Sequence, residues 1–364
     1  MQVADLDYDL PEELIAQTPA ADRDASRLLV VRRKSGQIED RTFRELPEIL
    51  SRSDFLVLND SRVFPARLFG QRETGGRVEL LLLRPAAPEA PEHSLQRAPE
   101  SNLEEAGLAR QAVWEALARP RRKLRVHSRI LFSPELSGTI VTEEAGEKVR
   151  IAFEFHGEFN DLLARVGHVP LPPYIRRLAG PADRQRYQTV YARHPGSVAA
   201  PTAGLHFTQA MLEQLKSRDI DSLFVTLHVG YGTFRPVKTA SIEEHRVDPE
   251  AFAISAAAAA GIRQSLSEGK RLIAVGTTTT RVLEHWLQRS PRLEPLTGET
   301  DLFIYPPFQF QMAQGLLTNF HLPRSSLFAL ACAFLGTELA HDCYRHAVKQ
   351  RYRFYSYGDC MLIL

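Results

Sequence analysis

The sequence predicts an α/β protein in which a large domain with a mostly parallel sheet carries an inserted small antiparallel β-barrel. In the C-terminal half, short apolar runs alternate with amphipathic helical segments, a pattern typical of a parallel sheet. Between residues 62 and 156, strand-like runs follow one another without helices, which favours a small barrel. We therefore expect one domain over residues 1–61 and 157–364, and the barrel over residues 62–156.

Each element of the large domain follows from the spacing of apolar residues. Short continuous apolar runs predict buried strands, and apolar residues three to four positions apart predict helices. The expected strands cover residues 27–31, 55–59, 222–230, 271–276, 301–308, 316–322 and 354–364. The expected helices cover residues 208–219, 256–269, 277–290, 325–336 and 338–352. Thr208 is a residue type that caps helix N-termini, so it should begin the first of these helices.

The predicted barrel contains one clear turn and one long interruption. The string TGG at residues 74–76 lies between two strand-like runs and predicts a hairpin. Residues 86–111 are rich in proline, alanine and glutamate, and they lack apolar periodicity. Such a composition cannot bury enough apolar surface to fold, so we expect a mobile surface insertion there.

Composition excludes several classes of protein. The chain has 364 residues, with 45 Lys plus Arg and 44 Asp plus Glu, so its net charge is only +1. A uniformly basic coat for nucleic acid is excluded, while a local basic patch is not. The three cysteines form no C-x-x-C pair, which favours buried thiols in a reducing compartment. Without an apolar signal core or a ~20-residue apolar run, we expect a cytoplasmic protein.

Two glycine-containing segments could form part of a ligand site. In GSVAAPTAGLHFT (196–208), small residues precede His206 and a helix whose free N–H groups could bind an anion. In TLHVGYGTFRPV (226–237), a predicted strand ends at His228 and two glycines, where ligands of α/β sheets commonly bind. An ordinary capped turn and a hydrogen-bonded core histidine explain the same residues without a ligand, so both interpretations stay open.

Two further segments break the apolar pattern at strand ends. AVGTTTTRVLEH (274–285) places four threonines at a helix N-terminus, which suits a carboxylate or another polar ligand. LLTNFHLPRSS (316–326) places Thr318, Asn319 and His321 at the end of an apolar strand. A multiply capped helix and polar core residues are the alternatives. The candidate binding residues in all four segments are Thr202, Gly204, Phe207, Gly230, Tyr231, Gly232, Gly276, Thr277, Thr278, Arg281, Thr318 and Asn319.

The sequence lacks the signatures of several common sites. It has no G-x-G-x-x-G loop, P-loop, G-x-S-x-G elbow or H-E-x-x-H helix. His245 and Asp248 have helical spacing but no evident third ligand, so we expect no metal site.

Three basic clusters in this near-neutral chain suggest a polyanionic partner. Residues 119–129 contain six Arg or Lys and no acid. Other clusters lie near residues 176–186 and 345–353, the latter interleaved with Tyr352 and Phe354. Arginine beside aromatic residues suits phosphate pairing and stacking on RNA bases, although single clusters are commonly just solvated surface. The candidate RNA contacts are Arg121, Arg122, Lys123, Arg176, Arg177, Arg351 and Arg353.

Several long strings together resemble one family, the S-adenosylmethionine:tRNA ribosyltransferase-isomerases of queuosine biosynthesis. The similar strings run nearly from end to end and leave out only residues 86–111. They are YDLPEELIAQTPA, RDASRLLV, FLVLNDSRVFPARLFG, PLPPYIRR, RYQTVYA, GSVAAPTAGLHFT, TLHVGYGTFRPV, AVGTTTTRVLE, LLTNFHLPRSSL and YRFYSYGDCMLI.

This resemblance implies an α/β domain with an inserted barrel and an unusual reaction. The ribosyl part of S-adenosylmethionine would be transferred to 7-aminomethyl-7-deazaguanine at the wobble position of a tRNA. Epoxyqueuosine would form, and adenine and methionine would leave. S-adenosylmethionine would be a consumed substrate, with no metal or redox cofactor, and we expect a monomer that binds the tRNA anticodon stem-loop.

The implied reaction needs a base, and His206, His228 and His321 are the candidates because only histidine titrates near neutral pH unperturbed. We favour His321, which is flanked by Thr318 and Asn319. The threonines from Thr277 to Thr280 could bind the methionine carboxylate, and Tyr231 or Phe207 could stack on adenine.

Three departures from the family pattern are visible, and two of them leave alternatives open. The string PPFQF stands where the family has Pro-Gly-Tyr-x-Phe. Asp248 stands where the family usually has histidine, and Gln314 stands where it often has aspartate. A non-catalytic tRNA-binding relative is therefore the main alternative. A conventional methyltransferase is another, although the usual glycine-rich loop is missing.

Overall fold

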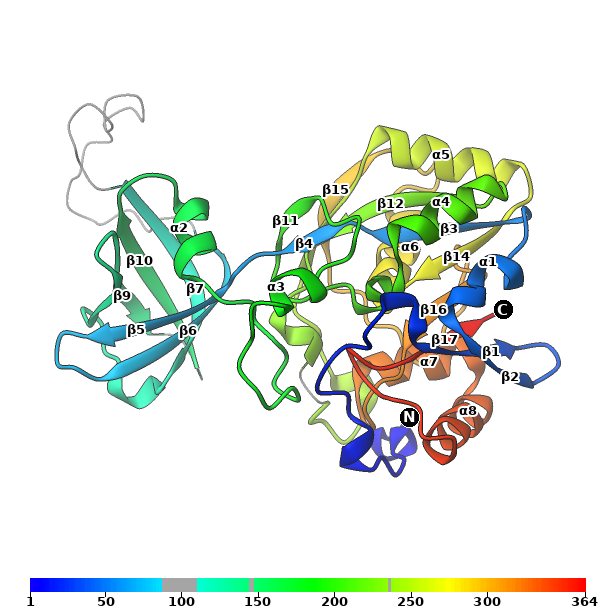
Figure 1. The fold of residues 1–364 in the computed structure, drawn as a ribbon, viewed down its shortest axis with the longest axis horizontal. Coiled ribbons are helices and arrows are strands. Elements are labelled where there is room, and N and C mark those ends of the chain that lie inside the picture. The colour runs from blue at the N-terminus through cyan, green and yellow to red at the C-terminus, as the bar shows by residue number, and fades with distance from the viewer. Residues whose placement is uncertain (87–109, 144–146, 235–236) are drawn as a thin grey trace. The chain divides into compact units, whose positions relative to one another are not determined.

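The computed structural model describes residues 1–86, 110–143, 147–234 and 237–364. These residues divide into two compact units, one formed by Met1–Arg62 and Leu171–Leu364 and the other by Val63–Pro170 (Figure 1). The α/β class with an inserted barrel is confirmed. Most of the predicted insertion, residues 87–109, lies outside the described residues.

The large unit is built on a nine-stranded mixed sheet in the order β15-β13-β12-β3-β14-β16-β17-β1-β2. Its strands are β1 (Arg27–Arg32), β2 (Gln37–Thr42), β3 (Asp54–Asn59), β12 (Asp221–Leu227), β13 (Glu250–Ile254), β14 (Arg271–Val275), β15 (Leu296–Thr300), β16 (Gly315–Asn319) and β17 (Cys360–Ile363). The neighbours β12, β3, β14 and β16 pair in parallel, as do β17 and β1. The other four pairs are antiparallel, so the sheet is less parallel than predicted.

Helices cover both faces of this sheet, because alternate residues of each strand point to opposite sides. In β3, Phe55 and Val57 pack with α5, α6, α7 and α8, whereas Leu56 and Leu58 pack with α1 and α4. The helices of this unit are α1 (Leu46–Ile49), α3 (Asp183–Arg186), α4 (Gln209–Ser217), α5 (Ala256–Ser267), α6 (Thr277–Arg289), α7 (Ser326–Leu335) and α8 (Thr337–Lys349). A strand buried on both faces needs apolar residues throughout, which explains the continuous run at residues 55–58.

Short elements complete the large unit. Its 3-10 helices are η1 (Val3–Leu6), η2 (Glu12–Leu14), η3 (Arg23–Ala25), η4 (Phe43–Glu45), η7 (Thr202–His206), η8 (Tyr231–Phe234) and η9 (Ile242–Glu244). A two-stranded sheet joins β4 (Ser61–Val63) to β11 (His194–Ser197). Thr208 caps α4 as predicted, since its hydroxyl accepts a hydrogen bond from the Met211 amide at 3.1 Å.

One predicted strand is wrong. Residues 301–308 have irregular structure, and the edge strand β15 lies just before them. Pro306 and Pro307 cannot donate hydrogen bonds to a neighbouring strand. The amides of Gln311, Met312 and Ala313 instead donate to the carboxylate of Glu284 on α6 at 3.0–3.1 Å.

The small unit is a closed six-stranded antiparallel barrel in the order β10-β7-β6-β5-β8-β9. Its elements are β5 (Arg67–Arg72), β6 (Arg77–Pro85), β7 (Arg110–Arg119), η6 (Arg121–Lys123), β8 (Arg129–Ser133), β9 (Leu136–Glu143), β10 (Lys148–Phe155) and α2 (Phe159–Val166). Every second residue of β10 is buried, which matches the two-residue period of a strand with one face inward. The predicted hairpin at residues 74–76 joins β5 to β6, with Gly75 at φ +84°.

The barrel unit ends later than the predicted boundary at residue 156. Helix α2 belongs to it, because Phe159 packs against Trp114, Phe153 and Phe155 with ring centroids 5.0–5.7 Å apart. Arg67 and His168 also exchange backbone hydrogen bonds of 2.8 and 3.1 Å.

Candidate active site

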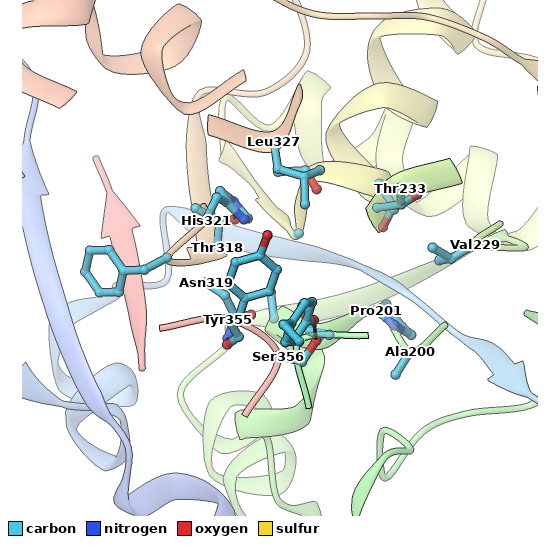
Figure 2. Close-up of a pocket in the computed structure, with 17 residues that line it drawn as sticks. Ala200, Pro201, Val229, Thr233, Thr318, Asn319, His321, Leu327, Tyr355 and Ser356 are labelled. Atoms are coloured by element: carbon cyan, nitrogen blue, oxygen red, sulfur yellow. Dashed lines mark hydrogen bonds between the residues drawn. The ribbon is translucent and has the colours of Figure 1, made fainter. Parts of the chain in front are cut away.

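A pocket of about 510 Å³ lies where the central parallel strands β14 and β16 end, and residues of the large unit alone line it (Figure 2). Figure 2 shows Thr318, Asn319 and His321 on one wall, with Val229 and Thr233 across from them. The lining residues are Tyr174, Ala200, Pro201, Thr202, Ala203, Val229, Thr233, Gly276, Thr277, Thr278, Thr318, Asn319, Phe320, His321, Leu327, Tyr355 and Ser356. The pocket therefore occupies the edge of the sheet where ligands of α/β proteins usually bind.

The N-terminus of α6 forms part of this pocket. Gly276 turns the chain from β14 into the helix at φ +92°, a backbone conformation that favours glycine. Thr279 and Thr280 donate their hydroxyls to the carbonyls of Val275 and Gly276 at 2.7 and 3.1 Å, so they brace the turn. Thr277 and Thr278 line the pocket instead, beside the positive end of the helix dipole. Half of the threonine run is thus structural, and half faces the cavity.

His321 is the histidine that lines the pocket. Its Nε2 lies 2.8 Å from the Thr318 hydroxyl, and its backbone amide donates to the Tyr344 hydroxyl at 3.2 Å. The Tyr8 hydroxyl donates to its carbonyl. Among the described residues, no hydrogen bond involves Nδ1. Burial lowers the pKa of His321 to about 3, so the ring is neutral at physiological pH and gains a proton less readily than an exposed histidine.

His206 lies behind the pocket wall and orients Asn319. Its Nδ1 is 2.7 Å from the Ser26 hydroxyl, and its Nε2 is 3.2 Å from Nδ2 of Asn319. Because an amide nitrogen only donates, Nε2 is the acceptor and the proton of the neutral ring sits on Nδ1. Burial and the charge of Arg23 lower the pKa of His206 to about 3. The lone pair of Nε2, which a base would need to accept a proton, is therefore already occupied by the hydrogen bond from Asn319.

Not all predicted site residues come together. The pocket collects Thr202, Gly276, Thr277, Thr278, Thr318, Asn319 and His321. His228 lines neither this pocket nor its neighbour, and a Cβ atom at Gly196 would lie 2.6 Å from its Nδ1. Burial and the charge of His194 lower the pKa of His228.

Several other candidates have structural partners instead. Phe207 is fully buried with its ring 5.0 Å from that of Phe43, so it cannot stack on adenine. A Cβ atom at Gly204 would lie 2.0 Å from the Tyr191 hydroxyl, so this glycine allows close packing. Gly230 donates its amide to Glu250 at 2.8 Å, and Gly232 lies against Asp248. Neither they nor Tyr231 line the pocket.

Arg281 is also turned away from the pocket. Its guanidinium forms a buried ion pair with Glu250 and donates to the Leu302 carbonyl at 2.7 Å. Glu250 in turn accepts from the hydroxyl of the pocket residue Thr233 at 3.1 Å. Arg281 therefore supports the pocket wall through Glu250 and does not line the cavity.

Aromatic residues near the C-terminus complete the site, and sequence reasoning missed them. Tyr355 lines the pocket at φ +71°, which is rare for a bulky residue and marks a site under local constraint. Its ring centroid lies 3.8 Å from that of Tyr174, whose hydroxyl bonds to that of Ser356. The available signal was the aromatic string FYSYGDC, which we interpreted as the beginning of the closing strand at residues 354–364, whereas β17 begins only at Cys360.

The departures at Asp248 and Gln314 leave the pocket intact. The Gln314 side chain accepts from the Leu272 amide at 3.0 Å, near the beginning of β14 and thus at the end of the strand opposite the pocket. Asp248 is exposed beside Gly232 and does not line the cavity. Neither substitution therefore removes a group from the pocket.

Several residues of the basic clusters already bind partners within the protein. Arg121 pairs with Glu143 at 2.9 Å, Arg177 with Asp183 at 2.6 Å, and Arg353 donates to the Thr18 carbonyl. Arg176 forms an exposed pair with Glu12. The remaining candidates, Arg122, Lys123 and Arg351, are exposed. Tyr352 and Phe354 are fully buried, so the predicted stacking on RNA bases is wrong for them.

No group of three or more histidine, cysteine, aspartate or glutamate residues is placed to bind a metal ion in the described part of the chain. The three cysteines are buried and unpaired. No helix among the described residues has the length and apolar character needed to cross a bilayer.

The two buried histidines should make stability depend on pH. In the unfolded chain, histidine takes up a proton below pH ~6.5, whereas His206 and His321 resist protonation until pH falls to about 3. Stability is therefore expected to fall as pH decreases through that window. Replacing His206 with glutamine should reduce the slope of unfolding free energy against pH by up to about 1.4 kcal/mol per pH unit. Urea unfolding between about pH 4 and 6 measures this slope, and an unchanged slope would contradict the assignment.

Comparison with known proteins identifies the family. A family model described as queuosine biosynthesis protein matches residues 3–363. S-adenosylmethionine:tRNA ribosyltransferase-isomerases from Solibacter usitatus and Carboxydothermus hydrogenoformans are 49% and 47% identical to this chain, each covering 100% of both chains. The crystal structure of S-adenosylmethionine tRNA ribosyltransferase from Thermotoga maritima is 36% identical and covers 99% of this chain and 100% of its own, with a TM-score of 0.54. The chain therefore belongs to the S-adenosylmethionine:tRNA ribosyltransferase-isomerase family of queuosine biosynthesis.

Proposed function

We propose that this protein transfers and isomerises the ribosyl part of S-adenosylmethionine onto 7-aminomethyl-7-deazaguanine at the wobble position of tRNA. Epoxyqueuosine-tRNA forms, and adenine and methionine are released. Family membership supports the reaction, and the observation that carries the mechanism is His321 in the wall of a 510 Å³ pocket at the strand ends. In this scheme S-adenosylmethionine is consumed as a substrate, and the reaction needs no resident cofactor.

The proposed mechanism begins with proton transfer to His321. The positive sulfur acidifies the adjacent ribosyl methylene, and Nδ1 of His321 accepts that proton while Nε2–H donates to the Thr318 hydroxyl. The ylide carbon forms a double bond to C4′ as the C4′–O4′ bond breaks, and O4′ becomes a C1′ aldehyde as the C1′–N bond breaks and adenine leaves with the proton held by His321. The amine of the modified base then adds to C4′ and loses a proton, which restores the ylide. The ylide carbon attacks the C1′ aldehyde, and the resulting alkoxide displaces methionine from C5′ and closes the epoxide. Since burial disfavours the imidazolium, a nearby negative group must stabilise it. The substrate's own carboxylate, bound at Thr277 and Thr278 on the N-terminus of α6, supplies that charge.

Asn319 is the second polar group in the mechanism. Its Nδ2 is held by His206 and by the carbonyls of Tyr355 and Asp359 at 3.1–3.4 Å. Its Oδ1 is buried and has no hydrogen-bond partner among the described residues. A buried acceptor without a partner costs free energy, which a donor on the substrate would recover. We assign this oxygen to an N–H of the modified base or of adenine.

A direct assay tests the proposed reaction. The protein is incubated with S-adenosylmethionine and an anticodon hairpin that carries the aminomethyl base, and the products are separated chromatographically. Stoichiometric adenine and methionine, with ribosylated RNA, support the proposal. S-adenosylhomocysteine would indicate a methyltransferase instead. Binding of the hairpin without adenine release would indicate a non-catalytic relative.

We also propose that the protein is a cytoplasmic monomer. Light scattering would check the oligomeric state, because a monomer has a mass of 41.0 kDa.

Exposed cations on the barrel are proposed to contact the tRNA backbone. Replacing Arg122 and Lys123 with glutamate should weaken hairpin binding and flatten its salt dependence, because each lost phosphate contact reduces counterion release. Fluorescence anisotropy at several salt concentrations measures both effects. The same change at Arg32 and Lys34, which are exposed on the large unit, is the charge-matched control. If hairpin binding by the two double variants had the same salt dependence, we would conclude that Arg122 and Lys123 do not contact the RNA.

A further inference from the structure

A second cavity of about 280 Å³ lies beside the proposed active site, and the proposed mechanism does not use it. Two arginines, Arg23 and Arg186, contribute to its lining. The full set of lining residues is Pro19, Ala20, Arg23, Ser26, Arg186, Leu205, His206, Ser356, Tyr357 and Gly358. The set contains two guanidinium groups and no carboxylate.

Both guanidinium groups are fixed by backbone carbonyls. Arg23 donates to the carbonyls of Leu205 and Gln185 at 3.0 and 2.8 Å. Arg186 donates to those of Ala20 and Ala21 at 2.7 and 2.8 Å. A guanidinium carries five N–H groups, so these bonds orient each side chain and leave donors for a ligand. The Nε atom of Arg186 is buried and has no hydrogen-bond partner among the described residues.

The positive charge of this pair is not balanced inside the cavity. Burial, followed by the charge of Arg186, lowers the pKa of Arg23. The nearby carboxylate of Asp183 is already bound by Arg177, by the Gly180 amide and by the Tyr357 hydroxyl, at 2.6–2.8 Å. Both arginines are partly buried, and like charges held close together repel each other unless an anion compensates them.

The cavity is linked to the catalytic pocket by shared residues. Ser356 lines both spaces. His206 lines the second cavity and bonds to Asn319, which lines the first. A ligand that fills the pocket and continues past Ser356 would therefore place its next group beside the two arginines.

We propose that Arg23 and Arg186 bind an oxyanion of the substrate, namely a backbone phosphate of the RNA next to the wobble nucleotide. This inference rests on the proposed function and adds a specific subsite to it. Planar guanidinium groups suit phosphate oxygens, and a fixed pair recognises them with little loss of side-chain entropy. The methionine carboxylate is the other oxyanion that the substrates supply, but the N-terminus of α6 is already available for it.

Steady-state kinetics of Arg186→Gln and Arg23→Gln test this subsite. Each variant is expected to raise the KM for the RNA hairpin by about tenfold, with the KM for S-adenosylmethionine unchanged. Arg33→Gln is the matched control, because Arg33 also donates to two backbone carbonyls and has a pKa lowered by burial, yet it lines neither cavity. A raised KM for S-adenosylmethionine alone would overturn the phosphate assignment in favour of the carboxylate. Unchanged KM values for both substrates would overturn the subsite itself.

A second measurement separates this inference from the proposed function. Inorganic pyrophosphate should raise the melting temperature of the wild-type protein, and Arg186→Gln should lose most of that shift while Arg33→Gln retains it. This readout needs no turnover, so it stands even if the wild-type protein releases no adenine. If Arg186→Gln does not fold, Arg186→Lys retains the charge but loses the fixed fork of donors, and it should show a reduced shift. Equal shifts in all folded variants would overturn the proposal.

Discussion

Replacing His321 with glutamine is expected to slow adenine release by about 100-fold or more, the usual loss on removal of a general base. Glutamine can still bond to Thr318 but cannot accept the proton, so the pocket should remain formed. The expected signature is a lower rate constant in single-turnover assays with little change in the KM for S-adenosylmethionine, because the loss affects the transition state and not substrate binding.

His285→Gln is the matched control for this variant. His285 is another buried histidine with a pKa lowered by burial, but it packs beside Phe252 and does not line the pocket. Its loss should leave adenine release close to the wild-type rate. His206→Gln should give an intermediate effect, because it disturbs the orientation of Asn319 without removing the base. If His321→Gln released adenine at the wild-type rate, the base would have to be another group.

The fold was largely predictable because its signals are local. Apolar runs at residues 55–59 and 271–276 indicate strands covered on both faces, and Thr208 indicates a helix start, without knowledge of any distant contact. The prediction failed at residues 301–308, where an apolar run has irregular backbone instead of a strand. Just after this segment, the amides of Gln311 and Met312 bond to Glu284 on α6, a long-range interaction that the local pattern does not contain.

The site was only half predictable, because a polar residue near a strand end can turn either toward a ligand or toward the protein. Thr318 and His321 face the cavity, whereas Arg281 from an equally suggestive segment pairs with Glu250. Phe207 and Gly204 lie in a motif that does reach the pocket, yet both serve packing. Tyr174 and Tyr355 are far apart in sequence and meet only in the folded chain. Spacing therefore locates the segments of a site, and tertiary contacts select the residues within them.

The three candidate histidines illustrate how tertiary contacts distinguish residues that the sequence treats alike. All three have a pKa lowered by burial, so titration alone does not distinguish them. Hydrogen bonding does, because Asn319 occupies the acceptor nitrogen of His206 while Nδ1 of His321 has no bond among the described residues. His228 also differs in position, since it lines neither cavity.

Replacing Arg281 with methionine is expected to lower the free energy of unfolding by about 3–5 kcal/mol, because the buried carboxylate of Glu250 would lose its charged partner. That is a large part of the ~5–15 kcal/mol typical of a folded protein. Urea unfolding at neutral pH measures the loss. The double variant Arg281→Met with Glu250→Leu should recover much of it, since no unpaired buried charge remains.

The same pair of variants decides between the two roles considered for Arg281. If Arg281 supports the pocket wall, Arg281→Met should lower the free energy of unfolding. The fraction of this variant that is folded should still bind S-adenosylmethionine. A binding role predicts a stable protein with a raised KM for S-adenosylmethionine, and that result would contradict the structure. Since Glu250 also bonds to Thr233 and Gly230, a moderate loss of rate in both variants would follow from a loosened pocket wall. The effect of Arg281 on catalysis would then act through the position of Thr233 and not through contact with substrate.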